Sequence, residues 1–157
     1  MAKEQDRPSI NPMVHPPIIA LMFIVIAYIL GRWVPLPFIA PAFLRYVGLF
    51  LAFVGFLLGI GALIEFRRVR TTLNPHGSVA QVVTSGIYRF TRNPIYLGFL
   101  CMVIGLPLNS GVYWGIIDAP FYILLMNRLV IQHEEAYLTR KFGKAYTNYT
   151  SQVRRWL

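Results

Sequence analysis

Long apolar runs without charged side chains are the feature that most constrains the fold of this chain. Residues 46–64 contain no charged side chain, and residues 93–127 contain only Asp118. A helix that crosses a bilayer needs about 20 mostly apolar residues, because the hydrocarbon core is about 30 Å thick. Charged residues make up 13% of the 157 residues, against about 25% in an ordinary soluble domain. The sequence therefore predicts an integral membrane protein.

The apolar sequence divides into four predicted spanning helices, at about residues 17–34, 43–64, 94–106 and 112–131. The run 93–127 would be about 50 Å long as one helix, too long for one crossing, so Pro, Asn and Gly in residues 107–111 predict a hairpin. The third helix is short, and it either re-enters the membrane or begins earlier. The fourth is expected to continue out of the membrane as far as Phe142. The predicted fold is all-α: one polytopic membrane domain, residues 1–157, with about four transmembrane helices plus a cytoplasmic C-terminal helix.

The basic residues indicate how the chain is oriented. In this topology 13 of the 15 Lys and Arg residues lie on one side, and only Arg32 and Arg45 lie on the other. Basic residues favour the cytoplasmic side, so both termini are expected in the cytoplasm, at the cell (inner) membrane or at the endoplasmic reticulum in a eukaryote. The 13 residues are Lys3, Arg7, Arg67, Arg68, Arg70, Arg89, Arg92, Arg128, Arg140, Lys141, Lys144, Arg154 and Arg155.

The sequence gives little support for nucleic-acid binding, a disulfide or a metal site. The net charge of +9 surrounds apolar segments and does not follow one soluble element, which argues against nucleic-acid binding. The single cysteine, Cys101, cannot form an internal disulfide and is interpreted as a small core residue. The three histidines, His15, His76 and His133, have no metal-site spacing, so no metal is predicted. Asp118 is either a functional intramembrane acid or a group that reaches water near the outer side.

Two polar segments, at about residues 80–96 and 127–156, flank the predicted hairpin and meet on the cytoplasmic side. They contain the sequences GIYRFTRNPIYLG and EEAYLTRKFGKAYTNYTSQVRRW. In this order, around a membrane hairpin, they resemble the isoprenylcysteine carboxyl methyltransferase family and, more distantly, the phospholipid N-methyltransferases. The resemblance covers about residues 71–156. It implies a helical membrane bundle that transfers a methyl group from S-adenosylmethionine, bound at the cytoplasmic face, to a lipophilic or amphipathic acceptor.

The resemblance also implies which residues contact the cofactor. The implied contacts are Gln81, Val82, Val83, Tyr88, Asn93, Pro94, Ile95, Tyr96 and Glu134. Their chemistry is compatible, because the Glu134 carboxylate can hold an ammonium group or ribose hydroxyls. The rings of Tyr88 and Tyr96 can stack on adenine or face the sulfonium cation. Arg92 joins the predicted set because its guanidinium can pair with the cofactor's carboxylate.

Simpler interpretations exist for the same residues. A pair such as Glu134 and Glu135 is also typical of a solvated helix end. Glu135 lies seven residues after Arg128 on the same helix face, and the two could form a structural ion pair. Arg89 and Arg92 could bind lipid phosphates.

Three positions depart from the isoprenylcysteine pattern. Ala80 stands where that family has His, and Asn93 stands where it has the His of a His-Pro pair. Val130 stands where the family has a substrate-side Arg, and Arg128 lies about 200° around the helix from that position. Either Arg128 takes the role of that arginine from a different face of the helix, or the acceptor carries no carboxylate, and we favour the second interpretation. The catalytic candidates are Arg128 and Glu135, the latter as the base that an ammonium acceptor would need.

Two other functions remain as alternatives. One is a phospholipid or amine N-methyltransferase of the same superfamily. The other, from a different class, is a non-catalytic membrane scaffold or a degenerate binding protein.

Overall fold

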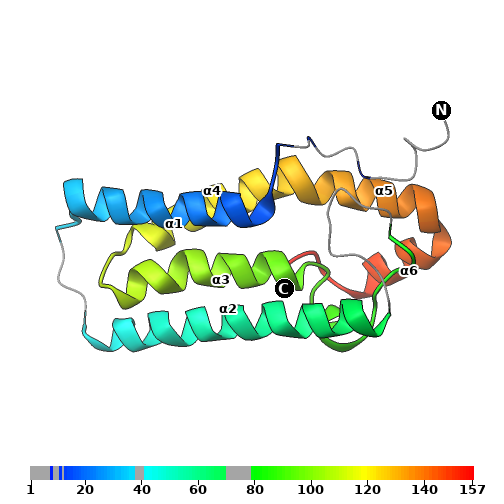
Figure 1. Ribbon diagram of the computed structural model, residues 1–157, viewed down its shortest axis with the longest axis horizontal. Coiled ribbons are helices and arrows are strands. Elements are labelled where there is room, and N and C mark those ends of the chain that lie inside the picture. Colours follow the sequence, from blue (N-terminus) through cyan, green and yellow to red (C-terminus); the bar gives the residue numbers. More distant parts are fainter. Residues whose placement is uncertain (1–7, 9–10, 12, 38–40, 70–78) are drawn as a thin grey trace.

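A computed structural model describes residues 8, 11, 13–37, 41–69 and 79–157 of this chain. Its long helices run along one axis (Figure 1). In chain order the elements are α1 (Pro16–Trp33), α2 (Phe43–Arg68), a 3₁₀ turn η1 (Gly86–Arg89), α3 (Pro94–Asn109), α4 (Trp114–Met126), a π-helical turn η2 (Asn127–Ile131), α5 (Gln132–Phe142) and α6 (Lys144–Gln152). The predicted all-α class is confirmed for the described residues. The described residues do not include the basic residues Lys3, Arg7 and Arg70 or the histidine His76.

Three helical stretches are long and apolar enough to cross a membrane: Pro16–Trp33, Phe43–Arg68 and the continuous helix Trp114–Phe142 that joins α4, η2 and α5. The fourth apolar helix, α3, has 16 residues and is about 24 Å long, shorter than the hydrocarbon core. Of the four predicted transmembrane helices, the structure thus gives three full-length candidates and one shorter helix. The predicted helix end at Phe142 is confirmed, and Gly143 follows it with φ of 52°.

The predicted break at residues 107–111 needs a correction. Helix α3 continues through Pro107 and ends at Asn109. Pro107 has no amide hydrogen to donate to the carbonyl four residues before it, but its own carbonyl accepts from the amides of Ser110 and Val112, at 3.0 and 2.8 Å, and these bonds close the last turn. The turn itself contains Gly111, with φ of 78°. Proline therefore shapes the last turn of the helix without ending it.

Helix α2 packs on α3 through two pairs of glycines. A Cβ atom built on Gly55 would lie 2.5 Å from the carbonyl oxygen of Gly98, and one built on Gly48 would lie 2.7 Å from that of Gly105. Both distances are well below a van der Waals contact, so the backbones touch at positions where only glycine fits. Gly59 forms a small-x-x-x-small pattern with Gly55, but a Cβ built on it would have no atom of the described residues within 4 Å. The contact therefore repeats every seven residues and not every four.

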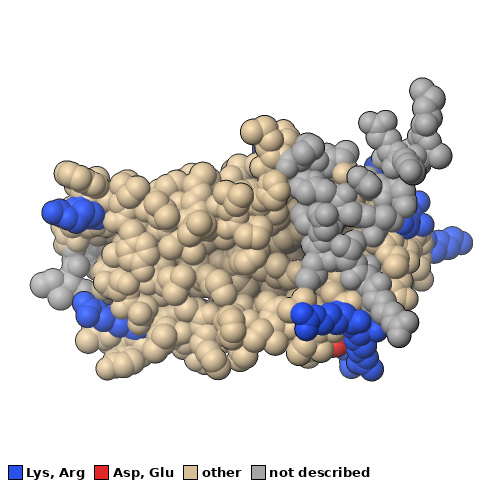
Figure 2. All heavy atoms as spheres, viewed as in Figure 1, with Lys and Arg blue, Asp and Glu red and all other residues tan. Residues whose placement is uncertain are grey.

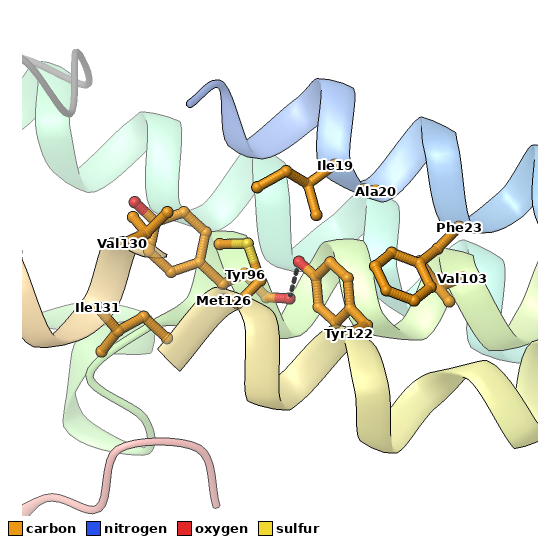
Figure 3. Packing of buried hydrophobic residues seen from close by; sticks show 9 residues of the cluster. All are labelled: Ile19, Ala20, Phe23, Tyr96, Val103, Tyr122, Met126, Val130 and Ile131. Atoms are coloured by element: carbon orange, nitrogen blue, oxygen red, sulfur yellow. Dashed lines mark hydrogen bonds between the residues drawn. The ribbon is translucent and has the colours of Figure 1, made fainter. Parts of the chain in front are cut away.

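The main apolar core lies between α1, α3 and α4 (Figure 3). Tyr122 and Val130 are fully buried there, and the rings of Phe23 and Tyr122 meet edge to face at 5.8 Å. The Tyr122 hydroxyl donates to the carbonyl oxygen of Tyr96 at 3.2 Å. This bond satisfies a buried polar group at the point where the first turn of α3 enters the core.

The charged residues separate along the long axis of the molecule. Lys and Arg side chains gather at its two ends and leave the middle of the visible face free of charge (Figure 2). Arg32 lies in the last turn of α1 and Arg45 in the first turn of α2, at one end. The C-terminal part of α2 and the helices α5 and α6 lie at the opposite end (Figure 1). This arrangement matches the charge asymmetry expected from the sequence.

Candidate functional site

A pocket opens at the end of the bundle where α2 ends and α3 begins, and α5 and α6 close its other sides. The cavity has a volume of about 120 Å³, and the space around it that includes the open mouth is about 840 Å³. The lining residues are Pro8, Phe66, Val79, Gln81, Val82, Val83, Tyr88, Arg92, Asn93, Pro94, Ile95, Tyr96, Glu134, Glu135, Tyr137, Leu138, Tyr146 and Tyr149. The polar segments on either side of the hairpin thus meet in one cavity.

The segment before α3 is anchored on the end of α2 by Glu65. This residue is 8% exposed, and its Oε2 accepts a hydrogen bond of 2.5 Å from the hydroxyl of Ser85. Gly86 follows with φ of 57°, and a Cβ there would lie 2.6 Å from Cδ of Glu65. Only glycine combines this backbone conformation with this close approach. The turn directs Tyr88 inward, where its ring meets that of Phe66 at 5.8 Å.

The C-terminal segment lies against the start of α3 (Figure 1). The amide of Arg92 donates to the carbonyl oxygen of Arg154 at 3.0 Å, and Nδ2 of Asn93 donates to that of Arg155 at 2.9 Å. The indole of Trp156 donates to Oδ1 of Asn127 in the π-helical turn at 3.2 Å. Arg154, Arg155 and Trp156 therefore connect the C-terminal segment to the start of α3 and to the π-helical turn.

The carboxylate of Glu134 is held inside the pocket by Tyr96, whose hydroxyl donates to Oε1 at 2.7 Å. Glu134 lies in the first turn of α5, three residues after the π-helical turn. Single π-helical turns are frequent at functional sites, because they change the direction in which the following side chains point. No pattern in the sequence indicates this turn.

Glu135 forms an ion-pair cluster with two arginines. Its Oε1 lies 3.2 Å from Nη1 of Arg92 and 3.0 Å from Nε of Arg155, and its Oε2 lies 2.5 Å from Nη2 of Arg155. The bidentate bond to Glu135 raises the pKa of the Arg155 guanidinium. On Arg92, the buried Nε has no hydrogen-bond partner among the described residues. Because Arg92 lines the pocket, its guanidinium can offer donors to an anionic group of a ligand.

Three tyrosines of the pocket remain protonated at neutral pH. Burial, followed by the nearby Glu134, raises the pKa of Tyr88 well above its usual range. Burial and then Glu135 raise the pKa of Tyr146 to about 12. Burial also raises the pKa of Tyr149, whose hydroxyl donates to the carbonyl oxygen of Tyr88 at 2.7 Å. These phenols therefore serve as donors and aromatic walls and not as bases.

The structure brings all ten sequence-predicted cofactor residues into the lining of this one pocket, and Glu135 joins them. Arg128 is exposed on the π-helical turn and is not among the lining residues that the structure describes. Val130 is fully buried in the core. Asp118 is 7% exposed, and its Oδ2 has no hydrogen-bond partner in the described part of the chain. It lies in α4, outside the pocket lining.

Part of the lining was not predicted from the sequence, namely Pro8, Phe66, Val79, Tyr137, Leu138, Tyr146 and Tyr149. The last four come from α5 and α6, which are otherwise polar. A signal was present, because Tyr146 and Tyr149 are three residues apart and share one helix face. Arg155 was missed as well, since nothing in a sequence shows which carboxylate a terminal arginine reaches.

Comparison with known proteins identifies the family of this chain. The sequence profile of the phospholipid methyltransferase family matches residues 43–145. The protein-S-isoprenylcysteine O-methyltransferase of Schizosaccharomyces pombe is 32% identical over 75 residues, which are 46% of this chain and 30% of that protein. A probable protein-S-isoprenylcysteine O-methyltransferase of Oryza sativa subsp. indica is 28% identical over 116 residues, which are 71% of this chain and 59% of that protein.

A further relative is an uncharacterized protein of Haemophilus influenzae, 39% identical over 66 residues, which are 40% of this chain and all of that protein. No solved structure matches the chain. The chain spans less than two thirds of the length of both isoprenylcysteine methyltransferases.

Proposed function

Because this chain belongs to the phospholipid methyltransferase family, we propose that it is a membrane-embedded enzyme that transfers a methyl group from S-adenosylmethionine to a lipophilic or amphipathic acceptor. The observation that carries the proposal is the pocket at the end of the bundle, where the ten predicted cofactor residues meet. The cofactor, when bound, supplies a methyl group on a sulfonium cation, a group that is transferred by in-line displacement.

The polar groups of the pocket fit the two charged ends of such a cofactor. The carboxylate of Glu134 suits an ammonium group or ribose hydroxyls. The guanidinium of Arg92, which lines the pocket, suits a carboxylate because it can offer parallel donors to it. The rings of Tyr88 and Tyr96 suit adenine or the sulfonium cation. Each charged end of the ligand thus has an opposite charge in the pocket.

The protein's own contribution is alignment and exclusion of water. Residues such as Val83, Ile95 and Leu138 give the pocket apolar walls between its polar groups. Helix α3, which begins in the pocket wall, continues into the apolar bundle. An acceptor with a lipid chain can therefore reach the pocket from the bilayer while its reactive group is held near the methyl donor.

The positions of Val130 and Arg128 support an acceptor without a carboxylate. Val130 is fully buried in the apolar core and cannot pair with a charge. Arg128 is exposed and does not take its place among the described lining residues. Both carboxylate oxygens of Glu135 are already bound by Arg92 and Arg155, so neither is placed to take a proton from an acceptor. An amine acceptor, which must first lose a proton, is therefore the less favoured alternative.

A labelled-methyl screen tests the proposal. Purified protein is incubated with S-adenosylmethionine labelled on the methyl group and with lipid extracts, and the products are separated by polarity. We expect label in the lipid fraction with the wild type and none with Glu134→Gln. A non-catalytic scaffold would transfer no label to any fraction.

A farnesylated cysteine analogue in the same assay tests the acceptor class, and we expect it to be methylated poorly. Robust carboxyl methylation that is lost in Arg128→Ala and retained in Arg128→Lys would instead show that Arg128 holds the substrate's carboxylate.

A further inference from the structure

Glu135 is shared between one arginine that lines the pocket and one that lies behind it. Arg92 contacts Glu135 through a single guanidinium nitrogen, at 3.2 Å. Arg155 contacts both carboxylate oxygens, at 3.0 and 2.5 Å, in a bidentate pair. Bidentate pairs are stronger and more directional than single contacts. Arg155 therefore occupies both oxygens of the Glu135 carboxylate, whereas Arg92 uses only one guanidinium nitrogen to contact it.

The charges of this cluster do not cancel. Two guanidiniums face one carboxylate, so the cluster of Arg92, Glu135 and Arg155 carries one excess positive charge. The side chains of Arg92 and Glu135 are only 15% and 17% exposed, and such a charge needs a partner when it is partly buried. Arg92 lines the pocket, so an anionic ligand group bound there can supply this partner.

We propose that Arg155 is a positioning residue for the carboxylate of the cofactor: it neutralises Glu135 and so leaves Arg92 free to bind that carboxylate. This inference rests on the proposed function, since it assigns a role toward the same cofactor. Arg155 itself is not among the described residues that line the pocket, and it acts only through Glu135 and Arg92.

The position of Arg155 is fixed independently of its side chain. Its carbonyl oxygen accepts hydrogen bonds from Nδ2 of Asn93 and from the hydroxyl of Thr91, at 2.9 and 3.3 Å. The following residue, Trp156, is bonded to Asn127. A substitution of the Arg155 side chain therefore removes the guanidinium while these backbone anchors remain.

Calorimetry with two ligands tests the inference. The probes are S-adenosylmethionine and its decarboxylated analogue, which lacks the carboxylate and keeps the ammonium group. In Arg155→Met, Glu135 pairs with Arg92 alone. We expect at least a tenfold loss of affinity for S-adenosylmethionine and less than a twofold change for the analogue. Arg154→Met is the matched control, because that side chain is exposed and its residue contacts Arg92 through the backbone.

A second substitution separates charge from structure. In the double variant Arg155→Met with Glu135→Gln, Arg92 again has no anionic partner in the cluster, so we expect affinity for S-adenosylmethionine to recover relative to Arg155→Met. Arg155→Lys, which keeps the charge, should fall between the wild type and Arg155→Met and serves if the methionine variant does not fold.

An equal loss for both ligands, or a further loss in the double variant, would overturn the inference and indicate a merely structural role. Failure of the wild type to bind either ligand would instead overturn the proposed function.

Discussion

The hydroxyl of Tyr96 donates a hydrogen bond of 2.7 Å to Oε1 of Glu134. The two residues occupy the third positions of α3 and α5, so this bond ties the first turns of two helices together inside the pocket. It also fixes one carboxylate oxygen and leaves the other for a ligand. The pocket is thus partly organised before anything binds to it.

We expect Tyr96→Phe to weaken S-adenosylmethionine binding about threefold to tenfold, because a hydrogen bond to a charged acceptor contributes about 1.5–3 kcal/mol and part of that energy orients Glu134. Calorimetry on detergent-purified protein measures the change. Tyr28→Phe is the control, since it removes a tyrosine hydroxyl that donates to the carbonyl oxygen of Leu106, near the far end of α3, and neither residue is among the described pocket lining. Unchanged affinity in Tyr96→Phe would remove the orienting role of this bond.

The glycine contacts between α2 and α3 predict a stability difference. Gly55→Ala places a Cβ 2.5 Å from Gly98 O, and such overpacking costs about 1–3 kcal/mol. Thermal unfolding in detergent should show a lower midpoint for this variant. Gly59→Ala, on the same helix and with open space around it among the described residues, should leave the midpoint unchanged or raise it. Equal effects of the two substitutions would contradict this packing.

Much of the fold was predictable because apolar length and charge are local properties of a sequence. The second predicted helix begins at residue 43 and the third at residue 94, as in the structure. The first was expected to start one residue later than it does. The end of α3 at Asn109 was not predictable in this way, since whether a helix continues through a proline depends on whether tertiary packing offsets the hydrogen bond that the proline cannot donate.

The candidate site was predictable only where a motif marks it. The motif residues line the pocket, but the partner of Glu135 did not follow from the sequence. Spacing along one helix suggested Arg128, whereas the structure pairs Glu135 with Arg92 and with Arg155, 20 residues further along the chain. That contact depends on how α5, α6 and the C-terminal segment fold back on the start of α3, which no local pattern contains.

Gly86 provides a test of how the segment before α3 is held. Gly86→Ala would combine a left-handed backbone, costing about 1–2 kcal/mol, with a Cβ 2.6 Å from Cδ of the Glu65 carboxylate. We expect displacement of Tyr88 and at least a fivefold loss of S-adenosylmethionine affinity. Gly61→Ala is the control, because its Cβ would make only ordinary contacts, at 3.8–3.9 Å, with Ile87. Equal affinities in both variants would show that Glu65 and Gly86 do not position this segment.

The charge distribution predicts the orientation of the chain. Reporter fusions at the C-terminus and between Arg89 and Thr91 should give a cytoplasmic signal, and a fusion at Ser110 should give a signal from the opposite side, because basic residues favour the cytoplasm. The protein carrying each fusion is checked for membrane insertion. An external signal from the Arg89 fusion would contradict the orientation.

Direct titration of S-adenosylmethionine into purified protein tests the central claim, that this pocket binds the methyl donor. We predict binding with one site per chain, weakened at least tenfold in Glu134→Gln, which corresponds to about 1.4 kcal/mol, with no change in the unfolding midpoint large enough to indicate loss of structure. Absence of binding to the wild type, or equal affinity in the wild type and Glu134→Gln, would contradict the account.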